Sequence, residues 1–392
     1  MAVATSRSNS TINALDLHFY QQLAALVNIS EPIAIALSGG IDSMCLLALA
    51  KNLGINTVAL IVNHNLRAET KHEINQLTQF LQHQQQPFKV LNWQHQGGIS
   101  GNTQAQARYN RYLLTTDYCQ QHGIKYLLTG HHHDDQLENF LMRQERGSGV
   151  VGLSGINKVI KINQINVVRP LLNLNKASLK HYLQQHQWPW WEDKSNSNPK
   201  YRRNYWRQQL LTMPEAEKNA LACKICNYQQ QAGQLRQEVT IAAQNIVCYN
   251  HNGAATVNYA QWLILPNEIK WHILLEVATT ASGQINGWRG NQLTALKHLF
   301  INASHNINTT WHGCIWQLHW QRQILTVYRE PAYIDHKLQL APGECKYWDK
   351  RWLVNNNSDY KIKVLHLKKF NHHYWPKLKQ QYLLKDIGHK HQ

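Results

Sequence analysis

Short apolar runs alternate with longer amphipathic segments through the first half of the chain. The runs are rich in β-branched and aromatic residues, and they cover residues 33–37, 57–63, 88–93 and 126–129, with a fifth starting at Val167. The segments between them have helical spacing over residues 42–53, 69–85, 103–122 and 134–146. This alternation predicts right-handed crossovers and an α/β fold, in which helices cover both faces of a parallel sheet.

The pattern weakens after about residue 211. Residues 215–248 have helical spacing, residues 259–279 contain strand-like and helix-like stretches, and residues 312–329 alternate as a β-hairpin does. No apolar run approaches the ~20 residues that cross a bilayer, and the first residues lack the apolar core of a signal peptide. The seven cysteines are too scattered for a disulfide framework. We therefore expect a soluble, cytoplasmic protein with no membrane partner.

The charge of the chain is concentrated in two segments. The 392 residues carry 40 Lys and Arg against 23 Asp and Glu, a formal net charge of +17. Residues 1–150 are neutral, with 10 basic and 10 acidic side chains, whereas residues 151–210 have 10 against 2 and residues 331–392 have 12 against 5. A neutral module beside two basic blocks indicates a small-molecule catalytic core attached to parts that bind a polyanion.

The first predicted strand ends in the sequence SGGIDS, residues 38–43, which opens a helix. Paired glycines let backbone N–H groups approach an anion, and the helix N-terminus adds its positive dipole end. Asp42 fits a phosphate site if a magnesium ion lies between them. No lysine follows the glycines, which excludes the GxxxxGKS loop. The alternative is a plain glycine turn with Asp42 as helix cap. We favour phosphate binding because a buried strand ends directly at Ser38.

The fourth strand leads into a loop with three histidines and three carboxylates, which are His131, His132, His133, Asp134, Asp135 and Glu138. Zinc is one candidate guest, because His is its commonest ligand. Consecutive histidines lack the HExxH spacing, however, and Asp135 and Glu138 project from one face of the next helix. Magnesium or a bound ammonium group suits these carboxylates better. Arg108 and Arg111, one turn apart, can hold phosphates from a shared helix face.

The sequence SGGIDS after a first strand resembles the signature of the PP-loop ATP pyrophosphatases. Further segments resemble the tRNA(Ile)-lysidine synthetase family over about residues 31–210, in the order NHNLR, ARYNRY, TGHHHDDQLENFLMRQERGSGVVGLSG, RPLL and WEDKSNSNPKYRRNYWR. This family ligates lysine to C2 of the wobble cytidine in the CAU-anticodon isoleucine tRNA, through an adenylated cytidine. The tRNA then changes its codon and its amino acid from methionine to isoleucine.

The resemblance implies a division into three domains. A Rossmann-like PP-loop catalytic domain would cover residues 1–214, a mainly helical tRNA-binding domain residues 215–332, and a small basic α+β domain residues 333–392.

The resemblance also implies roles for individual residues. The residues that would bind ATP are Ser38, Gly39, Gly40, Ile41, Asp42, Ser43 and Arg111. Magnesium would lie on Asp42 and Asp134. Asp135 and Glu138 would grip the substrate L-lysine, and Arg203 would contact ATP or the adenylate. The implied catalytic set is Asp42, Asp135, Glu138 and Arg203.

Residues 194–207 mix cations with aromatic side chains, a composition suited to an unpaired anticodon loop. The expected tRNA-binding residues are Lys200, Arg202 and Arg207. The alternative for this segment is a solvated helix whose Trp206 and Leu210 face the core.

Two other functions are weighed against lysine ligation. A PP-loop enzyme that thiolates tRNA needs cysteines near the nucleotide, whereas Cys45 and Cys119 are isolated in predicted helices. A non-catalytic RNA-binding protein on a PP-loop scaffold would not need an intact 38–43 loop. Cys223 and Cys226 form a lone CxxC, which we expect to be two helix cysteines. The sequence is compatible with a monomer and with a homodimer.

Overall fold

The chain divides into two compact units, Met1–Ala232 and Gly233–Gln392. The structure is a computed structural model, and it describes residues 13–64, 69–93, 103–191, 202–250, 253–283, 290–334, 337–349 and 352–365. These two units do not coincide with the three domains that the sequence suggests. The domain boundaries near residues 215 and 333 stay a prediction. None of the described helices is long and apolar enough to cross a membrane.

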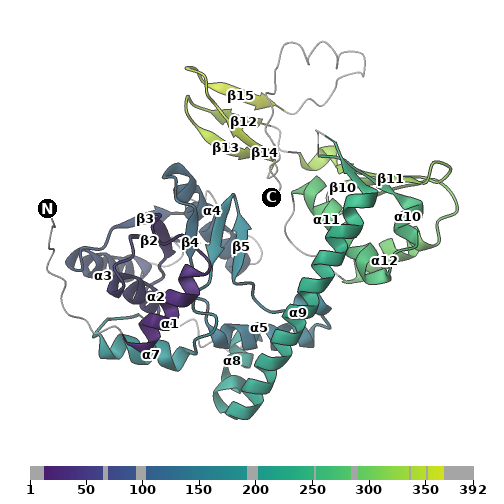
Figure 1. Cartoon of the computed structure of the whole chain (residues 1–392). Helices are drawn as coiled ribbons and strands as arrows, with labels where there is room; N and C mark the ends of the chain where they lie inside the picture. The colour runs from purple at the N-terminus through teal and green to yellow at the C-terminus, as the bar shows by residue number, and fades with distance from the viewer. Residues whose placement is uncertain are drawn as a thin grey trace. The chain divides into compact units, whose positions relative to one another are not determined.

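A six-stranded sheet forms the centre of the first unit (Figure 1). In spatial order its strands are β3 (Phe88–Asn92), β2 (Thr57–Asn63), β1 (Ile33–Ala36), β4 (Tyr126–Leu128), β6 (Ile165–Val168) and β5 (Val159–Ile162). The first five run parallel, and β5 pairs antiparallel with β6 at the edge. The predicted parallel sheet is therefore confirmed, together with each of its five predicted strands.

Helices cover both faces of this sheet, as the alternating pattern predicts. The helices of the first unit are α1 (Ala14–Ala24), α2 (Ile41–Asn52), α3 (Glu69–His83), α4 (Thr103–Gln121), α5 (His133–Glu145), α6 (Val150–Leu153), α7 (Lys176–Gln185) and α8 (Arg202–Thr212), and the long α9 (Glu215–Ile246) starts in this unit and continues past its end at Ala232. Ile33 and Ile35 of β1 pack with α1, α2, α3 and α7, while Ala34 between them packs with residues of α4 on the other face. The two-residue period of a strand thus builds one core on each side.

The strand order places a topological switch point between β1 and β4. From β1 the chain adds β2 and β3 on one side, and it then returns to add β4 and β6 on the other. The register pairs Ile33 with Thr57 on one flank and with Tyr126 on the other. The loops that leave the carboxyl ends of β1 and β4 therefore meet at one crevice, where open α/β sheets bind their ligands.

The edge strand β5 is an element that the sequence pattern does not predict. It is joined to β6 by a two-residue turn at Asn163 and Gln164, whose φ angles are 47° and 64°. Two positive φ angles define the type I′ turn, which usually carries glycine or asparagine. Gln164 stands where such a turn usually has glycine, and Lys161 interrupts the apolar run of β5. The sequence pattern therefore does not indicate a hairpin here.

The second unit contains a five-stranded antiparallel sheet in the order β7 (Val247–Tyr249), β8 (Ala255–Asn258), β11 (Ile324–Arg329), β10 (Cys314–His319) and β9 (Ile307–Trp311). Its helices are α10 (Tyr259–Leu263), α11 (Asn267–Ser282) and α12 (Gly290–Ile301). The pairing of β10 with β11 confirms the predicted hairpin. Trp262, Phe300 and Trp316 are fully buried in this unit.

Two small antiparallel pairs follow the sheet and the short 3₁₀ helix at Pro331–Tyr333. They join β12 (Lys337–Leu340) to β15 (Ile362–Leu365), and β13 (Cys345–Trp348) to β14 (Trp352–Asn355). A buried ion pair between Arg329 and Asp349, 3.0 Å long, connects the end of β11 to the turn after β13.

Candidate active site at the switch point

The loop after β1 is a hydrogen-bonded turn that leads into α2. Ser43 Oγ accepts a hydrogen bond from the Ser38 backbone N–H at 3.1 Å and donates one to the Gly40 carbonyl at 3.1 Å. The two serine hydroxyls are also 3.1 Å apart. Gly40 is the N-cap of α2 and offers no side-chain cap, so the first N–H groups of this helix are open to a ligand. This is the arrangement that an anion requires.

Gly39 adopts a backbone conformation that favours glycine. Its φ is +82°, and a Cβ atom there would lie 3.4 Å from a ring carbon of Trp191. The Trp191 backbone N–H donates to the Gly39 carbonyl at 2.9 Å, and its indole N–H donates to Gln76 at 3.0 Å. Trp191 therefore supports the loop from the segment that follows α7.

Gly130 brings the loop after β4 into direct contact with the loop after β1. A Cβ atom at this position would lie 2.8 Å from the Asp42 carbonyl carbon and 3.0 Å from the Ser43 backbone nitrogen. Real Cβ atoms do not approach backbone so closely, so the two loops can pack only because residue 130 has no side chain.

His132 connects the carboxylates of the two loops. This buried imidazole is the N-cap of α5, and its Nε2 lies 3.5 Å from Asp42 Oδ1 and 3.6 Å from Asp135 Oδ2. Burial opposes its charged form, but Asp42, Asp135 and Asp134 together raise its pKa above the usual value. The His132 backbone N–H also donates to Asp135 Oδ2 at 3.1 Å.

Two arginines from α8 neutralise the two buried carboxylates of α5. Arg203 Nη2 lies 2.5 Å from Asp135 Oδ1 and its Nε lies 2.7 Å from Glu138 Oε2. Arg207 Nε donates to Glu138 Oε1 at 2.8 Å. Glu138 is 1% exposed, so its charge is supported almost entirely by these guanidinium groups. Burial alone would raise the pKa of Asp135, but His132, Arg203 and His131 lower it to about 2.

His131 belongs to a more cationic side of the crevice. Burial lowers its pKa to about 3, and Arg169, Arg108 and Arg203 act in the same direction against Asp135. Its Nδ1 lies 3.0 Å from Thr129 Oγ1. Arg169 directly follows β6 and is 4% exposed, and its Nη1 donates to the Asn157 carbonyl at 2.6 Å.

His64, at the end of β2, is a second neutral histidine. Burial lowers its pKa to about 4, and the charge of Arg111 contributes. Its ring meets Trp93 edge to face at 6.0 Å. Arg111 of α4 is therefore close enough to His64 for its charge to act on this ring, and its role in binding ATP stays a prediction.

The structure brings most of the predicted site residues together. The 38–43 loop, Asp42, Asp135, Glu138 and Arg203 form one connected group through His132 and Gly130. Asp134 lies slightly apart, since its Oδ2 accepts the Lys176 backbone N–H at 3.4 Å.

The predicted tRNA-binding residues lie in different environments. Arg207 points inward to Glu138, and Arg202 pairs with Glu145 and lies 4.4 Å from the Tyr205 ring centroid. Leu210 is buried against α5, as the core alternative for this segment expects. Lys200 lies outside the described residues. The roles of all these residues stay predictions.

Sequence reasoning assigned no role to four residues that shape the site. All four stand within the quoted motifs, Trp191 as the first residue of the last motif. The motifs were therefore the available signal, but the contacts depend on tertiary packing between segments far apart in the chain.

Comparison with known proteins decides the family. A family model described as a PP-loop domain, for ATP binding, matches residues 15–214. A tRNA(Ile)-lysidine synthase from Wolbachia pipientis wMel is 31% identical over 369 residues, which cover 91% of this chain and 84% of that protein. The chain belongs to the tRNA(Ile)-lysidine synthase family. A second tRNA(Ile)-lysidine synthase, from Rickettsia typhi, is 34% identical and covers 83% of this chain and 76% of its own length.

Solved structures outside the family share the fold only weakly. The U34-tRNA thiolase NcsA from Methanococcus maripaludis, with its [4Fe-4S] cluster, matches with a TM-score of 0.47 and 14% identity, over 55% of this chain and 77% of that chain.

In this member of the tRNA(Ile)-lysidine synthase family, Cys45 and Cys119 do not suit thiolation. Cys45 and Cys119 are buried in α2 and α4, and burial raises the pKa of both thiols, that of Cys119 to about 12. A thiol with such a pKa stays protonated and is a poor nucleophile. Cys223 and Cys226 are exposed on α9, as expected for two helix cysteines.

Proposed function

We propose that this protein ligates L-lysine to C2 of the wobble cytidine in the CAU-anticodon isoleucine tRNA. The contact of the 38–43 loop with the Asp135–Glu138–Arg203 cluster is the single observation that supports this most strongly. Through Gly130 and His132, the uncapped N-terminus of α2 is connected to a pair of buried carboxylates. ATP activation and capture of an ammonium substrate can then take place in one crevice.

In the first half-reaction the C2 oxygen of cytidine attacks the α-phosphate of ATP and pyrophosphate leaves. The backbone amides at Gly39, Gly40 and the start of α2 would hold the phosphates, with the Ser38 and Ser43 hydroxyls as donors. Arg111 and Arg203 would contact ATP or the adenylate. These groups stabilise negative charge where it develops, which is catalysis by positioning and electrostatics.

A magnesium ion fits this loop. Asp42 Oδ1 is buried and makes no hydrogen bond within the described part of the chain, where His132 Nε2 lies 3.5 Å from it, so this oxygen can act as a cation ligand. Asp42 and Asp134 would hold the ion, which would supply charge neutralisation of the leaving pyrophosphate. No group of three or more His, Cys, Asp or Glu side chains is placed around a common metal position in the residues that the structure describes. Further ligands would therefore come from phosphates and water.

In the second half-reaction the lysine ε-amine attacks C2 of the adenylated cytidine and AMP leaves. Asp135 and Glu138 would bind the incoming ammonium group, which loses a proton before it attacks. Both carboxylates contact Arg203, and Glu138 also contacts Arg207. The guanidinium of Arg203 thus lies between the two carboxylates, where it would share them with the lysine ammonium group.

One assay tests the proposal and separates it from the alternatives. The full-length protein is incubated with CAU-anticodon isoleucine tRNA, labelled lysine, ATP and magnesium. We expect label in the tRNA, with loss of at least about a hundredfold in Asp42→Asn and Glu138→Gln, because each removes a charge that meets a substrate. ATP cleavage without lysine incorporation would refute lysine ligation. Binding of tRNA without ATP cleavage would instead indicate a non-catalytic RNA-binding protein.

A further inference from the structure

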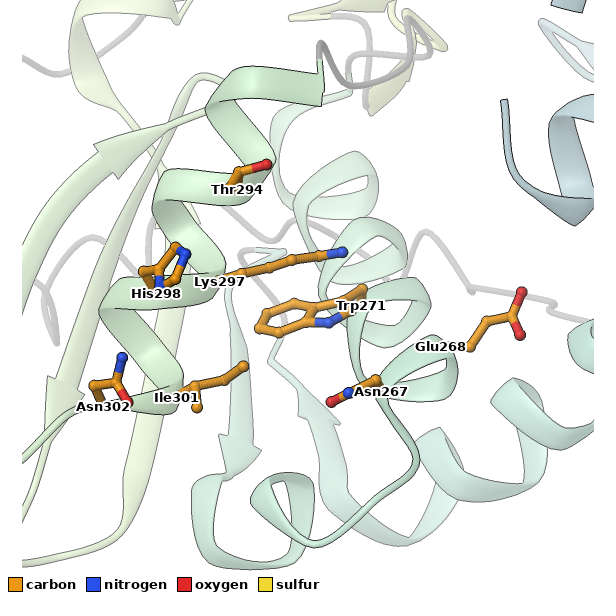
Figure 2. Close-up of a pocket in the computed structure, with 8 residues that line it drawn as sticks. All are labelled: Asn267, Glu268, Trp271, Thr294, Lys297, His298, Ile301 and Asn302. Atoms are coloured by element: carbon orange, nitrogen blue, oxygen red, sulfur yellow. The ribbon is translucent and has the colours of Figure 1, made fainter. Parts of the chain in front are cut away.

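The second unit contains a pocket that plays no part in the site above. It lies between α11 and α12 and has a volume of about 620 Å³ (Figure 2). This volume falls within the ~300–1,000 Å³ of typical small-ligand sites. Figure 2 shows Trp271 of α11 at its centre, with Lys297 of α12 extended across it and Ile301 beside it.

Trp271 is a fixed aromatic wall of this pocket, 7% exposed, with Lys297 over its ring. Its ring packs edge to face on the buried Trp262, with centroids 5.2 Å apart, so its orientation is set by the core. Lys297 Nζ lies 5.2 Å from the Trp271 ring centroid. No ion pair of Lys297 occurs in the described part of the chain, although Glu268 lines the same pocket. The ammonium group is therefore a cation without a salt bridge among the described residues, held over a ring that the core fixes.

The combination of an aromatic ring, an amide and a cation limits which ligands suit this pocket. A purely apolar ligand would leave Lys297 and the Asn267 amide unused, and an inorganic anion would leave the Trp271 ring unused. A nucleotide uses all three, because its base stacks on an aromatic ring, its base edge bonds to an amide, and its phosphate meets a cation. The flexible Lys297 side chain can move off the ring to the phosphate when a base stacks.

We propose that this pocket binds one unpaired nucleotide of the tRNA substrate, with its base against Trp271 and its phosphate on Lys297. The proposal rests on the proposed function, since that function supplies the RNA. A free nucleotide offers the same chemistry, so the experiment must separate the two sources.

The test measures the affinity of the full-length protein for a full-length CAU-anticodon isoleucine tRNA transcript at fixed salt. Lys297→Glu removes the cation, and Ile301→Trp fills the pocket from a residue that is 43% exposed and tolerates a larger side chain. We expect each to weaken binding roughly tenfold, the size of one lost stacking or phosphate contact. The matched controls are Arg322→Glu, elsewhere on this unit, and Leu299→Trp, on α12 but outside the pocket. Both should stay within about twofold of the wild type.

A set of transcripts, each with one abasic unpaired position, then identifies the nucleotide. One of them should bind the wild type roughly tenfold more weakly and lose nothing further with Ile301→Trp, because the pocket is already empty. Equal losses in the pocket variants and their controls would overturn the proposal. So would tRNA affinities unaffected by Ile301→Trp while that variant abolishes binding of free CMP, which would indicate a free-nucleotide site.

Failure of this proposal is distinguishable from failure of the proposed function. Affinity is measured without ATP or lysine, whereas the function is tested by lysine incorporation. A wild type that incorporates lysine, with pocket variants that bind tRNA normally, would refute the pocket alone. A wild type that binds tRNA through the pocket yet never incorporates lysine would refute the function alone.

Discussion

Gly130 has only hydrogen atoms where other residues have a side chain, and these atoms face the backbone of Asp42 and Ser43. Backbone cannot yield as a flexible side chain can, so any larger residue must separate the two loops. The position of the carboxylates of α5 relative to the 38–43 loop therefore depends on this one residue.

We predict that Gly130→Ala destabilises the protein by about 1–3 kcal/mol and lowers activity at least about tenfold, because the added methyl group overpacks the contact. Denaturant unfolding and pyrophosphate release measure the two effects. Gly149→Ala is the control, since a Cβ there meets nothing within 4 Å. Wild-type activity in Gly130→Ala would show that the loops do not need this contact.

Arg203 is held between two carboxylates and is still 40% exposed at its side chain. We predict that Arg203→Ala lowers pyrophosphate release about a hundredfold, as loss of a charge-stabilising group does, while tRNA affinity falls much less. The pKa of Asp135 should also rise, because Arg203 helps to lower it. The exposed Arg143 of α5 provides the control, as Arg143→Ala. Equal losses in adenylation and in tRNA binding would show that Arg203 is only a phosphate contact.

At the scale of elements, the β5–β6 hairpin turns through two residues with positive φ. A side chain in this conformation is strained, and glycine removes the strain. We predict that Gln164→Gly stabilises the first unit by about 0.5–1 kcal/mol, measured by denaturant unfolding. The same substitution at Gln229, inside α9, should have the opposite sign and cost about 1 kcal/mol. Loss of stability at both positions would show that the turn is not strained.

The β5–β6 hairpin also shows which kind of element the sequence pattern does not predict. Runs such as residues 57–63 predict strand bounds well, because a strand buried on both faces is apolar at nearly every position. Edge strand β5 has a lysine within its four residues, and its turn lacks glycine, so the sequence has neither a continuous apolar run nor a glycine turn to indicate the hairpin.

For the site, spacing predicts that Asp135 and Glu138 share a face of α5. It does not predict their partners, because Arg203 and Arg207 come from a helix about 65 residues later.

At the scale of the whole molecule, buried histidines link folding to pH. The pKa of His64 is about 4 and that of His131 about 3, both below the ~6.5 of an unfolded histidine. At a pH between the native and the unfolded pKa of such a histidine, the unfolded chain binds a proton that the native protein does not. The free energy of unfolding therefore falls as pH decreases below ~6.5. His132, whose pKa is raised, acts oppositely: its contribution is present below ~6.5 and is lost as pH rises.

We therefore predict a free energy of unfolding that decreases from pH 6.5 to 4.5, by at most ~1.4 kcal/mol per pH unit for each neutral histidine. His64→Asn should reduce this slope, whereas the exposed His319→Asn should leave it unchanged. Denaturant unfolding at several pH values provides the measurement. An unchanged slope in His64→Asn would show that His64 titrates normally.

The distribution of charge separates binding of tRNA from binding of ATP. The first 150 residues are neutral, and the basic residues cluster elsewhere. We predict that raising salt from about 50 to 200 mM weakens tRNA binding at least tenfold, because phosphate contacts release counterions. ATP binding, measured by calorimetry without tRNA, should change only a few-fold. Parallel losses for both ligands would contradict this division.

The order in which the site residues are translated has a consequence for biosynthesis. Ser38–Ser43 leave the ribosome early, but β1 needs β4 as a neighbour, and the carboxylates of α5 need arginines from α8. Domains acquire such distant contacts only after the intervening chain is made. A nascent chain that ends before α8 therefore carries the whole 38–43 sequence, while Asp135 and Glu138 still lack their arginine partners. Catalytic competence should thus appear late in synthesis, once Arg203 and Arg207 have emerged.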